Sequence, residues 1–498
     1  MKQSAASHLI SYLLPRTQDA IFICVLLIVC VRGSDLFNSD GDLGRHITLG
    51  KYMLGHGIPY YDIFSHTRAG RYLVSHEWLA QIAFAAAHAF MGLGGAVLLT
   101  AVLIATTFTL VYREMLRRNI SYLPALLITT LAALTSMLHW LARPHIFTFL
   151  FVALWTHRLQ KIMEGKSFNI WVFPLLMLVW ANTHGAFIMG FFILAAFFAG
   201  WIWQFLSREA SAEIGQKLLL VGVVSFAVTF INPYGWRLWG TSVGYFGNRF
   251  LVDYTVEYQS PNFHEFSVWP FLFMLAICLV APSLGRKIQV YEAFLLAGFA
   301  ALGLYSERNI PLFAIIAAPY IAYMLQPVFE RVPLSSRIQA TIKNVESQLQ
   351  ANSPVLPILS VLIMLLAIKQ GAPLDSSGLG YRYDPAKFPV AAVDWLEKNP
   401  QSGKMFNHFI WGGYLLYREW PEQTVFIDGQ TDFYGEALTL EYVQVETLHE
   451  NWQNVLAKYD VDWAIIKSDE VQLAKALQND LGWKVLYQDN TAVILRKP

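Results

Sequence analysis

Carboxylates and cations gather directly after the first long apolar run of the chain. In the stretch "SDGDLGRH", Asp40 and Asp42 follow Asp35 within eight positions, and Arg45 and His46 come next. A carboxylate close to a membrane surface can take the proton of an acceptor hydroxyl as a general base, which contributes about 10²–10⁴-fold to a rate. The stretch is therefore either a solvated loop or the beginning of a site, with Asp42 as the first candidate for the base.

The connection that carries these side chains, residues 37–76, leads back to the next apolar run. Its part 43–54 has apolar residues at helical spacing, which predicts a short helix along the membrane surface. Asp42 could serve that helix as an N-cap instead of acting as a base. His76 and Glu77 stand where the connection ends, so they either begin the next helix or bind a phosphate or a divalent metal.

Arginines and histidines in other polar connections are candidates for binding a phosphate. The planar fork of an arginine donates two parallel hydrogen bonds to a phosphate. Arg308 in "SERN" is the first candidate, and Arg143 in "ARPH" and His184 in "ANTHG" come next. The alternative for Arg308 is a side chain that extends towards lipid headgroups. The alternative for Arg143 and His184 is a local role at a helix end.

Further polar residues are expected to line the same cavity or to contact an acceptor. They are Asp40, Arg45, His46, Glu77, Glu257 and His264. Asp428 and Asp432 in "FIDGQTDFYG" are assigned to turns of a separate domain instead. No metal site is assigned firmly, although Glu77 with a histidine could hold a divalent metal.

The composition is that of a chain with many membrane spans. Of 498 residues, 55% are hydrophobic and 14% are charged, whereas charged residues make up about a quarter of a soluble protein. The mean hydropathy is +0.41. A net charge of +1 gives no reason to expect a nucleic-acid partner. The three cysteines all lie in apolar runs, so no disulfide framework is expected.

Eleven apolar runs are candidates for transmembrane helices, which need about 17–25 residues each. They cover residues 18–36, 77–112, 121–141, 146–162, 169–183, 186–206, 218–232, 267–282, 290–304, 309–325 and 354–369. The run 77–112 is broken at Gly92–Gly95, so it either crosses once or holds two short helices. We expect about 11 spans, and up to 13.

Lys and Arg in the short connections predict the orientation of these spans. Basic clusters at 113–118, 158–166, 208–217, 286–287 and 331–343 are placed in the cytoplasm together with the N-terminus. The connections between them then face outwards, and they are rich in Asp, Glu, His, Asn, Tyr and Trp. Polar residues gathered at one membrane face predict a cavity that opens to that face.

The pattern changes near residue 370. The linker "GAPLDSSGLGYRYDP" leads to an amphipathic stretch, "PVAAVDWLEKN", and to the β-rich runs "VFIDG", "DWAIIK" and "TAVILRK". We therefore predict a polytopic α-helical membrane domain over 1–370 and a soluble, extracytoplasmic α/β domain over 371–498.

Several motifs, taken in order, resemble the GT-C superfamily of membrane glycosyltransferases. In its aminoarabinose and protein O-mannosyl transferase branch, an acid precedes a Met by eleven positions in the first outer loop, as Asp42 precedes Met53, and a turn like "GIPYYD" follows. The motifs "ARPHIFTFLF", "WANTHGAFIMG", "INPYGWRLW", "EYQSPNFHEF", "SERNIPLFAIIAAP" and "GKMFNHFIWGGYLLY" resemble a large bacterial subgroup. The resemblance covers most of the chain and depends on the order of the motifs.

This resemblance implies a GT-C fold and transfer of a sugar, with inversion, from a polyprenyl-phosphate donor. The acceptor would be an envelope glycan, a lipid or a protein at the outer face of a bacterial inner membrane. Asp42 would be the base, and Arg308, Arg143, His76 and His184 would lie near the donor phosphate. The resemblance implies no firm cofactor, and a divalent metal is compatible with it.

The chain departs from the better-studied branch where the second helix begins. That branch often has a Lys-Pro pair that binds the lipid-linked phosphate, whereas this chain has "VSHEW". A non-catalytic scaffold for envelope polysaccharide assembly is therefore one alternative. A transporter of lipid-linked glycans is another, but it should have internal repeats or paired broken helices, and the sequence has no visible repeat.

Overall fold

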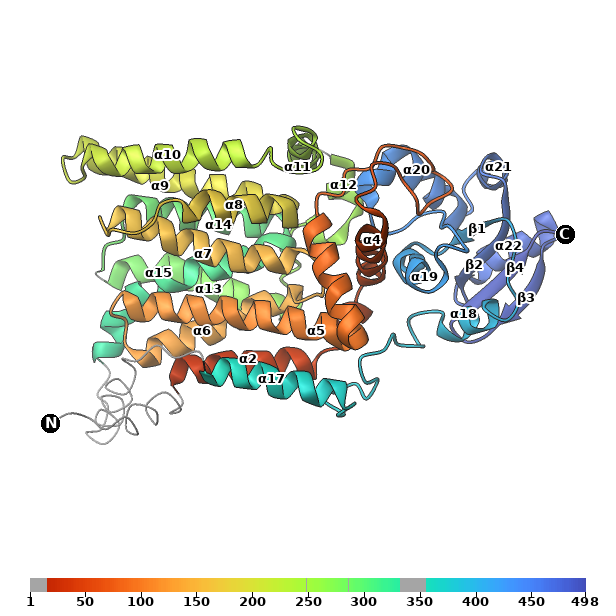
Figure 1. The fold of residues 1–498 in the computed structure, drawn as a ribbon, viewed down its shortest axis with the longest axis horizontal. Helices are drawn as coiled ribbons and strands as arrows, with labels where there is room; N and C mark the ends of the chain where they lie inside the picture. The colour runs from red at the N-terminus through yellow and green to blue at the C-terminus, as the bar shows by residue number, and fades with distance from the viewer. Residues whose placement is uncertain (1–15, 248, 285, 332–354) are drawn as a thin grey trace.

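Residues 16–247, 249–284, 286–331 and 355–498 are described by a computed structural model in which helices dominate. The long helices lie side by side in one bundle, and a smaller unit that contains a sheet covers one end of it (Figure 1). Apart from Arg331, the basic cluster 331–343 lies outside the described residues.

A helix overlaps each of the eleven predicted apolar runs. These helices are α2 (Thr17–Val31), α5 (Trp78–Arg117), α6 (Tyr122–Ser136), α7 (His145–Met163), α8 (Val172–Thr183), α9 (Ile188–Leu206), α10 (Ala212–Val228), α13 (Trp269–Val280), α14 (Val290–Tyr305), α15 (Ile310–Arg331) and α17 (Val355–Lys369). Five helical segments of the described chain are long and apolar enough to cross a membrane, those that contain α5, α6, α9, α13 and α15. The count of about 11 spans stays a prediction.

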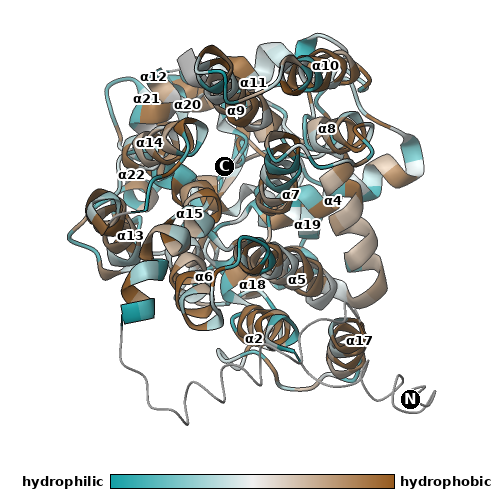
Figure 2. Ribbon diagram, turned by 90° about the vertical axis from the view of Figure 1, so that its left-hand side faces the viewer, coloured by the Kyte–Doolittle hydropathy of each residue, from teal (hydrophilic) through white to brown (hydrophobic). Residues whose placement is uncertain are grey.

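The outer surface of the bundle is apolar. Figure 2 views the bundle along its helices and shows hydrophobic residues along most of them. In α13, for example, Phe273 and Leu279 are 66% and 83% exposed. Water-soluble chains rarely leave large apolar surfaces uncovered, so this surface is suited to contact with lipid.

The two ends of the bundle differ in charge. The connections α5–α6, α7–α8 and α9–α10 all lie at the end away from the sheet (Figure 1), and the predicted basic clusters 113–118, 158–166 and 208–217 fall in them. There Arg118 pairs with Glu114 at 3.0 Å and with Glu292 at 2.8 Å. These three basic clusters thus share one end, as their alternation along the chain predicted.

Short elements fill the end that faces the sheet. They are α3 (Asp35–Asn38), α4 (Asp42–His56), α11 (Arg237–Gly247), α12 (Arg249–Tyr254) and the 3₁₀ turns η2 (Gly185–Phe187), η3 (Val256–Tyr258) and η6 (Glu307–Asn309). The remaining 3₁₀ turns are η1 (Met137–His139), η4 (Phe266–Val268), η5 (Ala281–Leu284) and η7 (Phe409–Trp411).

Helix α5 is broken near its beginning. Met91 has φ −146° and Gly92 has φ +59°, a left-handed value that glycine adopts without the steric cost of a side chain. The part before the break lies across the end of the bundle, and the longer part runs along it (Figure 1). The break therefore lies at the beginning of the predicted Gly92–Gly95, and it lets the first part of α5 support α4.

Helix α4 lies between the bundle and the sheet unit. It packs on α5 on one side and on α19 (Gly412–Glu419) on the other. A Cβ at Gly44 would collide with the Gly413 carbonyl, and a Cβ at Gly50 with the Gln81 carbonyl. Arg45 and Thr48 are buried because the sheet unit covers this side of α4. The short helix predicted over 43–54 is present, and its place along the membrane surface stays a prediction.

The sheet unit is a small mixed α/β structure. Its strands β1 (Lys404–Asn407), β2 (Val461–Lys467), β3 (Lys484–Gln488) and β4 (Ala492–Arg496) pair in the order β1-β2-β4-β3. Strands β1 and β2 are parallel, and the other two pairs are antiparallel. Helices α18 (Val390–Leu396), α20 (Thr431–Glu446), α21 (Trp452–Lys458) and α22 (Val471–Leu481) accompany them.

Two of the three predicted β-rich runs are strands, and one is not. The runs "DWAIIK" and "TAVILRK" lie in β2 and β4, but "VFIDG" forms no strand. Val425 pairs only with Ser65 of the first outer connection, in an isolated parallel bridge. The side chain of Asn407 accepts from the Phe426 N–H at 2.8 Å and donates to the Ile427 carbonyl at 2.9 Å. Side-chain hydrogen bonds thus replace a strand partner.

A buried ion pair joins the first outer connection to the sheet unit. Arg45 Nε lies 3.1 Å from Asp428 Oδ2, and both side chains are almost fully buried. The Tyr434 hydroxyl donates to the same carboxylate oxygen at 3.1 Å, and Arg45 also donates to the Gln430 side chain. Asp428 was predicted as a turn residue. Its other oxygen does accept from the Gln430 N–H, but its main contact is this pair.

We expect Asp428→Ala to destabilise the protein strongly. Removal of one partner leaves a buried guanidinium without its counter-charge, which costs about 3–5 kcal/mol in such pairs. Asp460→Ala is the matched control because Asp460 is 80% exposed in its pair with Lys404, and exposed pairs contribute about 0–1 kcal/mol. Heat unfolding in detergent measures the difference, and equal midpoints for the two variants would contradict the role given to the pair.

Candidate functional site

A cavity of about 280 Å³ lies where the bundle meets the sheet unit. Its polar lining comes from α4, from the beginning of α5, from the α6–α7 and α8–η2 connections, and from η3, η6 and the start of α20. These residues are Asp42, Arg45, His46, His76, Glu77, Arg143, His145, His184, Glu257, Tyr258, Arg308, Gln430, Thr431 and Asp432. The cavity therefore brings together residues that are up to 390 positions apart (Asp42 to Asp432).

Asp42 is the first residue of α4 and directs its carboxylate to an arginine. Gly41 is the N-cap of this helix, and the Asp42 N–H donates to Asp40 Oδ1 at 3.0 Å. Asp42 Oδ2 lies 2.5 Å from Arg143 Nη2. The N-cap alternative for Asp42 is therefore wrong, because Asp40 supplies the capping oxygen. The Asp42 carboxylate is left to act in the cavity, at a helix N-terminus, where a negative charge is favoured.

A second carboxylate, Glu257, lies between two arginines. Glu257 Oε2 is 3.4 Å from Arg143 Nη1, and Glu257 Oε1 is 3.2 Å from Arg308 Nη1. Arg308 also donates to the Tyr258 hydroxyl at 2.5 Å and lies over its ring. Burial would raise the pKa of Glu257, but the charges of Arg308 and Arg143 outweigh it and hold this pKa well below its usual range. Glu257 is therefore an anion in a place where two arginines bind it.

Three histidines surround the carboxylate of Glu77. His46 Nδ1 and His76 Nε2 are each 3.8 Å from a Glu77 oxygen, and His184 Nε2 is 3.6 Å away. Burial raises the pKa of Glu77, and it lowers the pKa of His46 and of His184. Neutral imidazoles and a carboxylate are ligands that divalent transition metals accept. A metal at Glu77 stays a prediction.

Hydrogen bonds determine which nitrogen of His184 carries its proton. The Trp180 indole N–H donates to Thr148 Oγ1 at 2.9 Å, so the Thr148 hydroxyl is free to donate to His184 Nδ1, also at 2.9 Å. The Ala186 N–H points to the same nitrogen at 3.4 Å. Because Nδ1 accepts, the proton of a neutral His184 lies on Nε2, which faces Glu77.

Part of the cavity lining is apolar. Phe149 of α7, Ile188 and Met189 of α9, Leu302 of α14 and Leu312 of α15 contribute to it. These residues belong to bundle helices. The cavity thus offers an apolar wall from the bundle in addition to its charged groups.

Most of the residues predicted for the site line this cavity. Asp42, Arg308, Arg143, His76, His184, Arg45, His46, Glu77 and Glu257 all do so. Asp40 is not part of the lining, although its carboxylate lies 3.5 Å from Arg143. His264 was placed wrongly: it is exposed and outside the lining. It belongs to a turn in which its N–H donates to Asn262, and polarity alone did not distinguish that turn from the cavity rim.

Several lining residues were missed in the sequence. Gln430, Thr431 and Asp432 reach the cavity from the sheet unit, although "FIDGQTDFYG" was noted and assigned to turns. His145 follows Arg143 in "ARPH", and Tyr258 follows Glu257 in "EYQ". Each of these two residues lies within two positions of a predicted site residue. This proximity was the available signal, and it was not used for His145 or Tyr258.

We expect the titration of Asp40 to reduce stability as the pH rises. Burial raises the pKa of Asp40 to about 7, against the opposing charge of Arg143. An acid with a higher pKa in the folded than in the unfolded state, where it is about 4, binds more protons when folded. The free energy of unfolding therefore falls between about pH 4 and pH 7.

Asp40→Asn should remove this dependence and keep the capping oxygen. Its midpoint of heat unfolding should rise relative to wild type from pH 5 to pH 8, whereas Asp35→Asn, at an exposed position, should follow wild type throughout. Parallel profiles of Asp40→Asn and wild type would show that Asp40 titrates at its ordinary pKa.

Solved structures of membrane glycosyltransferases share this arrangement of the chain. Oligosaccharyltransferase AglB from Archaeoglobus fulgidus, in complex with an inhibitory peptide and a dolichol-phosphate, matches with a TM-score of 0.59 and 15% identity over 90% of this chain and 69% of that chain. ArnT from Cupriavidus metallidurans, bound to undecaprenyl phosphate, matches with a TM-score of 0.52 and 14% identity over 96% and 97%. Arabinofuranosyltransferase AftD from Mycobacteria matches with a TM-score of 0.51 and 13% identity, over 91% of this chain and 37% of that chain.

No protein-family model and no curated protein matches the chain by sequence. The three solved structures are GT-C glycosyltransferases, and each match covers nine-tenths or more of this chain. At these identities the likeness concerns the fold. The chain has the fold of the GT-C glycosyltransferases.

Proposed function

We propose that the protein transfers a sugar from a polyprenyl-phosphate donor to an acceptor hydroxyl, with inversion at the anomeric carbon. The observation that supports this most directly is the position of the Asp42 carboxylate beside Arg143 in a cavity that also holds Arg308 and an apolar wall. A donor of this class likewise combines a charged phosphate with an apolar chain. The structural neighbours AglB and ArnT were solved with dolichol-phosphate and undecaprenyl phosphate.

In the proposed reaction Asp42 is the general base. The acceptor oxygen forms a bond to the anomeric carbon while its proton passes to the Asp42 carboxylate. The bond between that carbon and the phosphate oxygen breaks, and the electron pair leaves with the polyprenyl phosphate. Arg308 and Arg143 stabilise the charge that develops on this phosphate, since guanidinium groups bind phosphate oxygens in pairs. His76 and His184 border the same space and complete the donor site.

We further propose that this chemistry takes place at the outer face of a bacterial inner membrane. The end of the bundle that carries the basic connections would lie in the cytoplasm, following the positive-inside rule. The cavity, the first connection 37–76 and the domain 371–498 would then lie outside, where envelope glycans, lipids and proteins are available as acceptors. The sheet unit would form the outer wall of the site through Gln430 and Asp432.

Asp42→Asn should lower kcat by about 10²–10⁴-fold, the usual contribution of a general base. The substitution retains the shape of the side chain, so the KM for the donor should change much less than kcat. The measurement is transfer by the purified protein in lipid, with a panel of polyprenyl-phosphate sugars. Asp35→Asn is the matched control because it makes the same change at an exposed position seven residues earlier in the chain. Full activity of Asp42→Asn would exclude this residue as the base, and an inactive wild type would favour the scaffold alternative.

Glu257→Gln should increase the affinity for undecaprenyl phosphate. Glu257 now neutralises Arg143 and Arg308, so an incoming phosphate must replace it. In Glu257→Gln the phosphate no longer has to displace a charge-assisted contact of about 1.5–3 kcal/mol, so the Kd for the lipid should fall by roughly tenfold or more. Binding of the lipid in detergent measures this, with Glu265→Gln at a nearby exposed position as the control. Weaker binding by Glu257→Gln would mean that Glu257 contacts the ligand and does not compete with it.

A further inference from the structure

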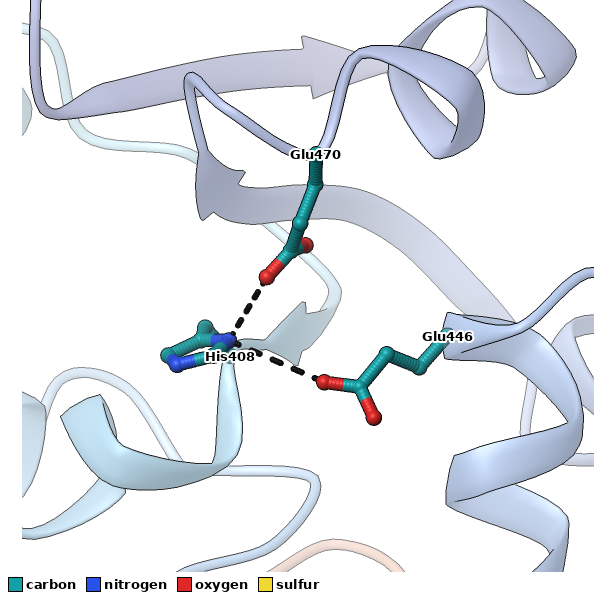
Figure 3. Close-up of side chains that lie close together, drawn as sticks. All are labelled: His408, Glu446 and Glu470. Atoms are coloured by element: carbon teal, nitrogen blue, oxygen red, sulfur yellow. Dashed lines mark ion pairs between the residues drawn. The ribbon is translucent and has the colours of Figure 1, made fainter.

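A second group of titratable side chains lies in the sheet unit, outside the cavity lining. His408 directly follows β1, Glu446 is the last residue of α20, and Glu470 directly precedes α22. Figure 3 shows the two carboxylates directed at the ring of His408. Three separate elements thus present three potential metal ligands to one point, and sugar transfer as proposed above uses none of them.

The spacing of the ligand atoms suits a small divalent metal. His408 Nδ1 is 2.7 Å from Glu470 Oε1 and 4.0 Å from Glu446 Oε1, and the three ligand atoms all lie within 4.8 Å of one another. A tetrahedral zinc ion with bonds of about 2.0–2.1 Å holds its ligands roughly 3.3–3.4 Å apart. The two observed distances from His408 lie on either side of that value, so small rotations of the glutamates would form the site.

The burial of His408 indicates that its ring is built to bind something. His408 is 7% exposed, and both of its ring nitrogens are buried without a hydrogen-bond partner in the described part of the chain. The contact of Nδ1 with Glu470 is an ion pair without the alignment of a hydrogen bond. A buried polar atom without a partner costs free energy, and a metal bond to Nδ1 would remove that cost.

The charges at this point also favour a cation. The carboxylates of Glu446 and Glu470 both approach His408 Nδ1. Two carboxylates held close together repel each other, and a divalent ion between them would relieve the repulsion. The Tyr442 hydroxyl lies 3.3 Å from Glu446 Oε1 and can orient that side chain.

The cluster is connected to the cavity through the residue before His408. Asn407 holds the backbone of Phe426 and Ile427 with its side chain. The next residue, Asp428, forms the buried pair with Arg45. A bond that fixes the end of β1 would therefore also fix the loop that supplies Gln430 and Asp432 to the cavity wall.

We propose that His408, Glu446 and Glu470 bind one divalent transition metal, zinc in first place, which joins β1, α20 and α22. One nitrogen and two carboxylate ligands are typical of zinc and exclude a soft, thiolate-preferring site. The glutamates are partly exposed, so water completes the coordination. The metal is structural and supports the sheet unit, and the proposal holds whether or not the chain transfers sugar.

The test uses the full chain in detergent, stripped with a chelator and then titrated with Zn²⁺. The background is Glu77→Gln, which removes the carboxylate among the cavity histidines and so weakens the binding of an ion there. We expect one zinc per chain by elemental analysis after desalting, and a higher midpoint of heat unfolding than in the stripped protein. Co²⁺ in place of zinc should give the visible absorption of a site with nitrogen and oxygen ligands.

Glu470→Gln and Glu446→Gln should each lose the bound zinc and the rise in midpoint. Glu441→Gln is the matched control, because Glu441 lies on the same helix α20 but contacts Lys458 and Tyr459 instead. A variant whose midpoint of heat unfolding equals that of the metal-free parent is folded. Its loss of zinc is then due to the missing ligand and not to unfolding. Failure of the parent to take up zinc or cobalt would overturn the proposal, as would unchanged zinc binding in both glutamine variants.

Discussion

The arrangement around the cavity depends on the charge of Arg143, whose side chain is only 17% exposed. Its guanidinium contacts Asp42, Asp40 and Glu257 at 2.5, 3.5 and 3.4 Å. A buried cation is tolerated only where anions and hydrogen bonds compensate for the water it has lost. Two of these acids come from the first connection and one comes from η3, so the charge of Arg143 holds together segments that are more than 200 positions apart in the chain. The position of Asp42 follows from this requirement.

Charges in the cavity are balanced before any ligand is present. Glu257 is shared by Arg143 and Arg308, and Glu77 lies among imidazoles whose pKa burial keeps low. An incoming anion would therefore exchange with a carboxylate and would not add a new charge to a buried site. Such an exchange costs less than new desolvation of two arginines, because the protein has already removed them from water.

The sequence predicted the features that depend on local pattern. The eleven apolar runs, the break in α5 and the strands β2 and β4 each follow from composition and spacing over a few residues. Asp42, Arg143 and Arg308, which line the cavity, were predicted for the site because charged residues at one membrane face are rare and informative in an apolar chain. Long-range contacts were not accessible in this way. Nothing near Arg45 indicates that its partner is Asp428, and "VFIDG" has a strand-like composition although its hydrogen bonds go to Asn407 and to the first connection.

Three glycines explain how the sheet unit can come close enough to form a wall of the cavity. Gly44 of α4 leaves room for the Gly413 carbonyl, and Gly50 leaves room for that of Gln81, so α4 touches both the sheet unit and the bundle. At Gly429 a Cβ would collide with the Asp42 carboxylate itself. A side chain there would have to move Asp42 away from Arg143, or move the loop that carries Gln430 and Asp432 out of the cavity. The geometry of the candidate base is therefore set from the sheet unit as much as from the membrane domain, because the same short loop pairs with Arg45 and borders Asp42.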